Sequence, residues 1–560
     1  MIDSKRVILI GLDGLGRGEV GEWIDDGTLP TLGSLSGTGT EAVLESTHPP
    51  WTPCAWPSLA SGRNPGEHGV FDFFTREGES YEKRLVDRRD VRAPYLWEVA
   101  DACGLSSVVI NFPVTHPASD LDSGALVPGY LASEDVEFHP PDVRTDFEDE
   151  YGEYRIYPQY DAGSEAVAEY TDVARCRRDM ARLLDARYDW DLLAVQFQVT
   201  DSVFHDLEDR EEIEAVLQQV DGYVDDVTDL APDATVFVVS DHGMGDYEWT
   251  FYMNTWLADH DYCRVTAGEA AYFRERKSDL LATNGENATP DGSDTSVGGR
   301  LVGRTADALA ALGLPPERIH RGLSTVGLAE VVERVLPEET LLAAQRRTVD
   351  WAHSGAFQLY FNSLGIHINR DDSNDSVEEK EGHEVAWNGT DGDWEHDYET
   401  FRNRLIADLR AITDPDGNRV FEDVKPREAV YEGANVDMAP DVLVFPREYA
   451  YDVSGSIATT FRSNPHKNHE PDGLFVTDRP LELGTELTHA SIYDVAPTVA
   501  ACLGIPIDTD TDGEMLPILD RDCELDDRAW SDFADSYRTV ETERSSGDVE
   551  ARLADLGYME

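Results

Sequence analysis

The sequence has few cysteines and few basic residues, and it lacks long apolar runs. Its six cysteines are scattered without a CxxC pair, which argues against a disulfide framework or a cysteine-based zinc site. We therefore expect reduced, mostly buried thiols. No stretch is apolar enough to cross a membrane, and the N-terminal MIDSKRVILIGLDG does not have the pattern of a signal peptide. A cytoplasmic location is the expectation.

The shortage of positive charge is large. The 560 residues include 112 Asp and Glu but only 46 Lys and Arg, which gives a formal net charge of -66. Such charge destabilises the compact state unless salt screens it, and in molar salt the screening length falls to about 3 Å. A high-salt cytoplasm, as in a halophile, is the setting we infer. The negative electrostatic field of such a protein argues against nucleic acids and anionic membranes as partners. The sequence leaves the oligomeric state undefined.

Short apolar, β-branched runs alternate with amphipathic helical patterns along the chain. This alternation predicts an α/β fold, a doubly wound and mostly parallel sheet with helices on both faces. The predicted strands are 6–12, 106–112, 191–197, 234–239 and 441–445. The predicted helices are 19–25, 30–36, 94–103, 164–188, 212–230, 398–412 and 491–503.

Changes in composition divide the chain. We expect a catalytic core formed by 1–260 and 351–520, with an inserted cap at 261–350 and an acidic tail at 521–560. The core would carry an acidic loop at 371–397, and the cap a polar stretch at 277–299 and helical patterns at 305–312 and 325–336. We expect 245–350 and 370–400 to select the substrate.

The chain is organised around residues 49–74, PPWTPCAWPSLASGRNPGEHGVFDFF. Prolines crowd its start, and Gly, Asn and Pro interrupt its end, so that a short helix fits at about 55–60. Thr52 would lie at or just before the N-terminus of that helix, where free N–H groups and the helix dipole favour an anion. A simple cap is the alternative role for this threonine.

Polar residues follow the predicted strands where parallel strands would share one edge. Each has an ordinary alternative, such as a turn aspartate or a surface Asp–His pair on a helix, but their joint occurrence indicates a metal site. Mixed Asp and His ligands suit zinc, manganese or iron, and seven ligands are about right for two ions. The set is Asp13, Thr52, Asp201, His205, Asp241, His242 and His469, the last in a predicted loop that spans most of 463–475 before a short strand.

On these residues the sequence resembles the alkaline phosphatase superfamily. The likeness is to its type I phosphodiesterase/nucleotide pyrophosphatase branch, including predicted phosphohydrolases or phosphomutases of archaea. The motifs include Leu12-Asp13-Gly14, Thr52 with Ala55-Trp56, Gly66-Glu67-His68-Gly69, Asp201 to His205, Ser240-Asp241-His242-Gly243 and Asp494-Val495-Ala496-Pro497.

The resemblance implies a phosphohydrolase with two divalent ions, Zn²⁺ or alternatively Mn²⁺, and a small phosphorylated substrate. Asp13, Thr52, Asp241 and His242 would bind one ion, and Asp201, His205 and His469 the other. Thr52 would be the nucleophile and would carry the phosphoryl group as an intermediate. A diester is the favoured substrate because the sequence shows no arginine clamp for a dianionic monoester.

The sequence departs from the family pattern at two positions. Cys54 stands where a proline is common, and Phe73 stands where nucleotide pyrophosphatases have an asparagine that contacts the phosphoryl group. Asn111 is the substitute we expect to bind substrate. A phosphomutase remains an alternative, and a non-catalytic binding protein is disfavoured because all seven residues are present. A sulfatase is rejected because Thr52, which cannot form formylglycine, occupies the position of its modified residue, and Trp56 occupies that of its essential arginine.

Overall fold

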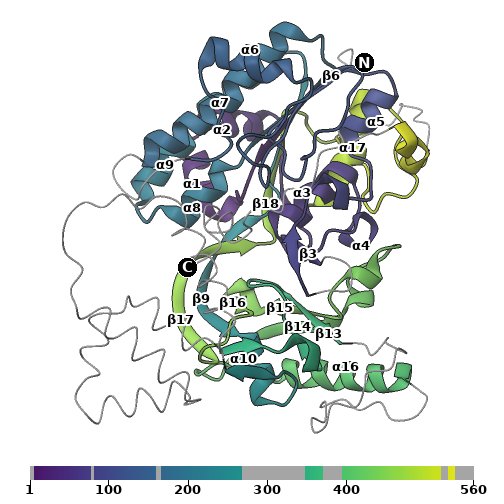
Figure 1. Ribbon diagram of the computed structural model, residues 1–560. Helices are drawn as coiled ribbons and strands as arrows, with labels where there is room; N and C mark the ends of the chain where they lie inside the picture. Colours follow the sequence, from purple (N-terminus) through teal and green to yellow (C-terminus); the bar gives the residue numbers. More distant parts are fainter. Residues whose placement is uncertain are drawn as a thin grey trace, which may run out of the picture.

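The computed structural model describes residues 6–76, 81–158, 166–267, 347–369, 394–482, 484–518 and 528–536. An eight-stranded sheet of order β19-β2-β18-β8-β1-β7-β5-β6 forms the centre of the larger lobe (Figure 1). β18 is antiparallel to both of its neighbours, whereas the remaining pairs are parallel. The strands are β1 (Val7–Leu12), β2 (Thr40–Glu45), β5 (Ser107–Ile110), β6 (Gly124–Val127), β7 (Leu192–Phe197), β8 (Thr235–Val239), β18 (Asp472–Thr477) and β19 (His489–Ser491).

The central strands are apolar throughout because both faces of the sheet are covered. Ile8 and Ile10 of β1 pack into the core on one face, and Val7 and Leu9 pack into the core on the other. Every residue of β1, β7 and β8 is buried. The continuous apolar runs in the sequence therefore correspond to a sheet between two layers of helices, which confirms the predicted fold class.

The two layers of helices lie on opposite sides of the sheet (Figure 1). One layer consists of α1 (Arg17–Asp25), α2 (Pro30–Thr38), α6 (Asp142–Tyr151), α7 (Ala166–Arg187), α8 (Val199–Asp206) and α9 (Arg210–Thr228). The other consists of α3 (Thr52–Ser61), α5 (Leu96–Ala102) and α17 (Val495–Leu503), with the short α4 (Pro65–His68) after α3.

A smaller lobe lies below the larger one in Figure 1. Its four-stranded sheet has the order β12-β13-β15-β14 and pairs antiparallel throughout. Its elements are α10 (Met253–Asp259), β12 (Ala356–Phe357), β13 (Gly365–Ile368), α16 (Trp394–Arg410), β14 (Phe421–Pro426) and β15 (Val442–Pro446). The predicted second part of the core, 351–520, is thus shared between this sheet and the large one.

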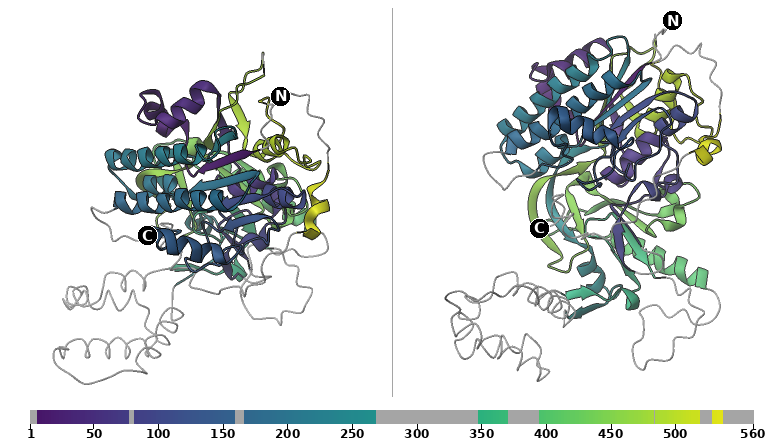
Figure 2. Two further views of the ribbon diagram at one scale, coloured as in Figure 1. Left: turned by 90° about the horizontal axis from the view of Figure 1, so that it is seen from above. Right: turned by 45° about the horizontal axis from the view of Figure 1, so that its top comes forward.

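A long ribbon joins the lobes. β9 (Gly243–Tyr252) pairs antiparallel with β17 (Phe461–Glu470), and β16 (Tyr451–Ser454) pairs with the other edge of β9. Figures 1 and 2 show β9 and β17 side by side as they curve from one lobe to the other. Two short antiparallel pairs complete the described strands: β3 (Phe74–Arg76) with β4 (Lys83–Leu85), and β10 (Val265–Ala267) with β11 (Arg347–Val349).

Two local predictions need correction. The segment 463–475 is not a loop before a short strand, because most of it continues β17, and His469 therefore lies in a strand. Asn464 and Pro465, the turn signals there, fall at a shift in the β9–β17 register, where a proline is tolerated. The helix predicted at 55–60 begins at Thr52, because Pro53 is acceptable in the first helical turn.

Several predictions lie outside the described residues. These are the polar stretch 277–299, the helical patterns 305–312 and 325–336, most of the loop 371–397 and most of the tail 521–560. The end of the predicted loop begins α16 at Trp394. The division into core, cap and tail stays a prediction. In the described part of the chain, no helix has both the length and the apolar composition that crossing a membrane requires.

Candidate metal centre

The candidate site lies at the carboxyl edge of β1, β7 and β8. Asp13 directly follows β1, Asp201 lies in α8 just after β7, and Asp241 and His242 follow β8. Because these strands are parallel neighbours, their ends bring the side chains together. β17 then places His469 beside them, since His469 pairs with Met244 across the ribbon.

Asp13, Asp241 and His242 form the first of two buried groups, with ligand atoms within 4.8 Å of one another. His242 Nε2 is 3.7 Å from Asp13 Oδ1 and 3.4 Å from Asp241 Oδ2. Thr52 is the first residue of α3, and its hydroxyl lies against this group, 3.5 Å from Asp13 Oδ1 and 3.5 Å from His242 Nε2. The hydroxyl therefore faces polar atoms rather than apolar packing.

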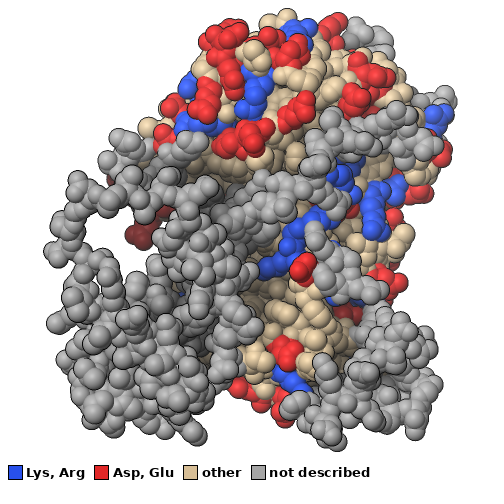
Figure 3. Space-filling view, in the orientation of Figure 1, with Lys and Arg blue, Asp and Glu red and all other residues tan. Residues whose placement is uncertain are grey.

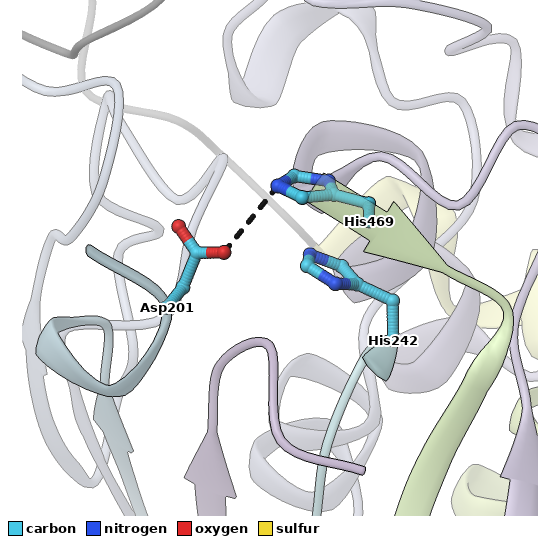
Figure 4. A group of neighbouring side chains, drawn as sticks. All are labelled: Asp201, His242 and His469. Carbon is cyan, nitrogen blue, oxygen red and sulfur yellow. Dashed lines mark ion pairs between the residues drawn. The ribbon is translucent and has the colours of Figure 1, made fainter. Parts of the chain in front are cut away.

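Asp201 and His469 form the second group together with His242. Figure 4 shows Asp201 pointing toward the two imidazole rings, which stack on each other at 3.8 Å. His469 Nε2 and His205 Nε2 each lie 3.3 Å from Asp201 Oδ1. His205 is the outermost member, with 23% of its side chain exposed. The structure therefore brings all seven predicted residues to one place, with His242 between the two groups.

Backbone carbonyl groups fix which nitrogen of each buried histidine is protonated. His242 Nδ1 donates to the carbonyl oxygen of Gly243 at 3.0 Å, and His469 Nδ1 donates to that of Pro50 at 3.2 Å. A carbonyl oxygen only accepts, so the proton of each neutral ring is on Nδ1. Both Nε2 lone pairs then face the carboxylates, which is the form of histidine that binds a metal.

Burial and mutual repulsion dominate the electrostatics of the three carboxylates. Burial, followed by the charges of Asp241 and Asp201, raises the pKa of Asp13 well above its usual range, and burial followed by Asp201 does the same for Asp241. Burial also opposes ionisation of Asp201, but the charge of His205, whose Nε2 lies 3.3 Å from Asp201 Oδ1, outweighs it and lowers the pKa of Asp201 well below its usual range.

The donor set fits divalent cations. Asp241 Oδ2 is buried without a hydrogen-bond partner in the described part of the chain, and Asp201 Oδ1 faces only the imidazole nitrogens of His205 and His469. Buried carboxylates that lack hydrogen bonds are costly unless a cation neutralises them. Carboxylate oxygens and neutral imidazole nitrogens together suit zinc or manganese better than calcium or magnesium.

Two residues that hold Asp13 are absent from the predicted site. Asp13 Oδ2 accepts hydrogen bonds from Trp56 Nε1 at 2.8 Å and from Gln196 Nε2 at 2.7 Å. The sequence does mark Gln196 as unusual, because it is the one polar residue in the apolar run of β7. Asn111, predicted to bind substrate, is fully buried, and its amide donates to Gln196 Oε1 at 2.8 Å. In this structure its NH₂ group donates to Gln196, and Gln196 in turn donates to Asp13.

Cys54 lies in α3 close to Thr52 but is fully buried. Burial, with a smaller contribution from Asp72, raises the pKa of its thiol well above the usual range. The thiol is therefore neutral and unreactive, as expected for a small packed residue.

Comparison with known proteins relates this arrangement to one family. Residues 7–295 match the family model described as type I phosphodiesterase / nucleotide pyrophosphatase. No curated protein matches the sequence significantly.

Solved structures share the fold at low sequence identity. Phosphonoacetate hydrolase from Sinorhizobium meliloti 1021, solved with phosphonoacetate, is 14% identical at a TM-score of 0.50, over 89% of this chain and 95% of that one. Murine ectonucleotide pyrophosphatase/phosphodiesterase 5 is 11% identical at a TM-score of 0.47, over 91% and 97%. Identities this low establish likeness of fold alone. That likeness rests on phosphonoacetate hydrolase, whose TM-score reaches 0.50.

Proposed function

Since this chain belongs to the type I phosphodiesterase / nucleotide pyrophosphatase family, we propose that it hydrolyses phosphate diesters through a phosphorylated Thr52 at a centre of two divalent metal ions. The observation that carries the proposal is the position of the Thr52 hydroxyl. It lies 3.5 Å from Asp13 Oδ1 and 3.5 Å from His242 Nε2, at the N-terminus of α3. Family membership makes the chain a hydrolase of phosphoester bonds, and the nucleophile and the metal number are our inference.

The seven side chains divide between two ions. Asp13, Asp241 and His242 would hold one ion beside Thr52, and Asp201, His205 and His469 the other. When bound, zinc or manganese ions would lower the pKa of the threonine hydroxyl and offset the negative charge that builds up on the phosphoryl oxygens. Trp56 and Gln196 fix the orientation of Asp13, since both donate to its Oδ2 and leave Oδ1 facing Thr52.

The chain's own part in the reaction has two steps. Thr52 Oγ1, whose hydroxyl donates toward Asp13, forms a bond to phosphorus as the bond to one ester oxygen breaks. The alcohol leaves with the proton, and the remaining ester group stays on the phosphothreonine. Water then adds to phosphorus, and Thr52 is released as the hydroxyl with one of the protons of water.

A diester is the favoured substrate because no positive side chain contacts the nucleophile. In the described part of the chain, Thr52 makes polar side-chain contacts with Asp13 and His242 only. A dianionic monoester would gain most from an arginine clamp, which these contacts do not include. A diester carries one negative charge less and depends on such a clamp less.

We expect bis-p-nitrophenyl phosphate to be hydrolysed with Mn²⁺ or Zn²⁺ at high salt. Its kcat/KM should exceed that of p-nitrophenyl phosphate by about tenfold or more, a difference of roughly 1.4 kcal/mol in transition-state stabilisation. Release of p-nitrophenol measures both reactions in parallel. A preference for the monoester would contradict the proposal. Isomerisation of a sugar phosphate without free phosphate would show a phosphomutase instead.

We infer a high-salt environment from the net charge of -66. Figure 3 shows acidic side chains crowded over the upper part of the face it displays. Self-repulsion of these charges should lower the unfolding temperature as KCl is diluted from about 1 M to about 10 mM, because the screening length rises from about 3 Å to about 30 Å. Thermal unfolding across a KCl series measures this. An unfolding temperature that stays constant or rises on dilution would contradict the halophilic assignment.

A further inference from the structure

A group of polar side chains on the ribbon lies next to the candidate metal centre and has no part in the chemistry described above. Asp452 lies in β16, and His466 and Asn468 lie in β17, on opposite sides of β9 in the sheet of order β16-β9-β17. Asp452 reaches across β9: its Oδ1 accepts a hydrogen bond from Asn468 Nδ2 at 2.8 Å, and its Oδ2 lies 3.1 Å from His466 Nε2. One carboxylate therefore joins the two outer strands of the ribbon.

Side chains hold the backbone of His469 in place. Among the described residues β17 has β9 as its single partner strand, so part of its backbone has no neighbouring strand to bond. The His469 N–H donates to Asn468 Oδ1 at 2.9 Å, and the Tyr247 hydroxyl donates to the His469 carbonyl oxygen at 2.7 Å. Burial, followed by the charge of Asp452, raises the pKa of Tyr247 well above its usual range, so this hydroxyl keeps the proton that it donates.

The amide of Asn468 connects Asp452 to the metal centre. Its Nδ2 donates to Asp452 while its Oδ1 accepts from the His469 N–H, so the amide bridges the two residues. His469 Nε2 in turn lies 3.3 Å from Asp201 Oδ1. The side chain of Asp452 is only 12% exposed, so little water competes for these contacts. Partners that orient a metal-binding histidine commonly change metal affinity by about 10–100-fold when they are lost.

His466 gives Asp452 a second hold on the same strand. The register between β9 and β17 shifts between Ser463 and His466, and an irregularity of this kind disrupts the ladder of hydrogen bonds locally. His466 Nδ1 donates to the Asn464 carbonyl oxygen at 2.8 Å, and its Nε2 faces Asp452. Asp452 therefore holds β17 directly after the shift, on the side that leads to the metal centre.

Asp452 has a fixed position from which to act. Its strand, β16, pairs with β9 along its length, with Asp452 opposite Thr250. Just after the strand, the Gly455 N–H donates to the Phe361 carbonyl oxygen of the smaller lobe at 2.7 Å. The carboxylate is thus attached to a strand that is held from two sides.

We propose that Asp452 is a positioning residue, which acts through Asn468 to hold His469 where it binds the ion shared with Asp201 and His205. This inference rests on the proposed two-metal function and adds a residue to it. Asp452 touches neither the ion nor the substrate, and its effect falls on the affinity of that one ion.

The test exchanges the two partners of one hydrogen bond. Asp452→Asn leaves a single acceptor oxygen for two donors, and Asn468→Asp places two carboxylates against each other. Each single variant should bind the ion at His469 about tenfold more weakly. The double variant restores a donor opposite an acceptor, keeps an acceptor for the His469 N–H, and should return to within about threefold of the wild type. Calorimetric titration of the metal-free proteins with Mn²⁺ measures these affinities.

The signs of the two single variants separate positioning from charge. Asp452→Asn removes a negative charge and Asn468→Asp adds one, so long-range attraction alone would weaken Mn²⁺ binding in the first and strengthen it in the second. Loss of position weakens binding in both. Tighter binding by Asn468→Asp, or a double variant no better than the single ones, overturns the proposal. A lowered unfolding temperature with unchanged Mn²⁺ affinity also overturns it, because the role is then structural.

Asp246→Asn is the matched control. Asp246 lies in β9 of the same ribbon, with its side chain 86% exposed, and pairs with Lys467 at 3.0 Å. The variant removes the same charge from the ribbon without touching Asn468, and it should leave both Mn²⁺ affinities within about twofold of the wild type. A loss as large as that of Asp452→Asn would show that charge is responsible and would overturn the proposal.

One further variant identifies the ion and separates this inference from the proposed function. His205→Ala should weaken one of the two Mn²⁺ binding steps, and the Asp452 and Asn468 variants should weaken the same step. Diester hydrolysis with two ions bound, unaffected by these variants, would reject the positioning role and leave the diesterase. Weakened and restored Mn²⁺ binding in a protein that hydrolyses no diester would reject the diesterase and leave the positioning role.

Discussion

Thr52→Ala is expected to lower kcat for bis-p-nitrophenyl phosphate by about 10³-fold or more, without a comparable loss of stability. The variant removes the oxygen that we propose attacks phosphorus. The hydroxyl contributes little to folding, because its two polar contacts are both 3.5 Å long. Steady-state kinetics and thermal unfolding of the same preparation measure the two effects.

Thr498→Ala is the matched control. Thr498 is fully buried in α17, where its hydroxyl donates to the Asp494 carbonyl at 2.6 Å and accepts from the Leu516 N–H at 2.9 Å. Its loss should cost about 1–2 kcal/mol of unfolding free energy and leave kcat unchanged. Thr52→Ser should keep measurable turnover because it retains the hydroxyl. Wild-type turnover in Thr52→Ala would remove the threonine from the mechanism.

Asp241→Asn is expected to have opposite effects on stability with and without metal. In the metal-free protein it removes one of three buried carboxylates that repel one another, and the free energy of unfolding should rise by about 1–2 kcal/mol. The wild type should gain about 2.7 kcal/mol from metal at ~100 times its Kd, and the variant much less, because it lacks a ligand. Thermal unfolding of the wild type and of Asp241→Asn, each with chelator and with excess Mn²⁺, measures the four stabilities.

Asp221→Asn provides the contrast for that experiment. Asp221 is also a buried aspartate, but both of its oxygens are used: Oδ2 accepts from the Thr31 N–H at 2.9 Å and Oδ1 from the Leu32 N–H at 3.0 Å, in the first turn of α2. Its replacement should destabilise the metal-free protein and leave the metal-induced gain intact. A metal-induced gain of wild-type size in Asp241→Asn would exclude Asp241 as a ligand.

The sequence was informative where one physical constraint acts over a short stretch. The buried strands β1, β7 and β8 are continuous apolar runs, and parallel pairing obliges their ends to meet, so the sequence alone could place Asp13, Asp201 and Asp241 together. Residues that act through a partner were harder to find. Gln196 is marked as unusual by being the one polar residue of β7, but its partner Asp13 follows the neighbouring strand β1, so the segment alone does not identify the contact.

Long-range pairing explains the errors. β17 contains Asn464 and Pro465, which locally favour a turn, but β9 supplies a partner strand more than 200 residues earlier in the chain. β2 and β6 were missed as well; their strand state depends on the neighbours that flank them in the large sheet.

The ribbon of β9 and β17 has a mechanical consequence. His242 precedes the first residue of β9, and His469 is the next-to-last residue of β17, while the opposite ends of both strands, Tyr252 and Phe461, reach the smaller lobe. A tilt of that lobe would therefore move the imidazole groups of His242 and His469 together. If the centre holds the ions proposed above, metal binding and lobe orientation would therefore affect each other reciprocally.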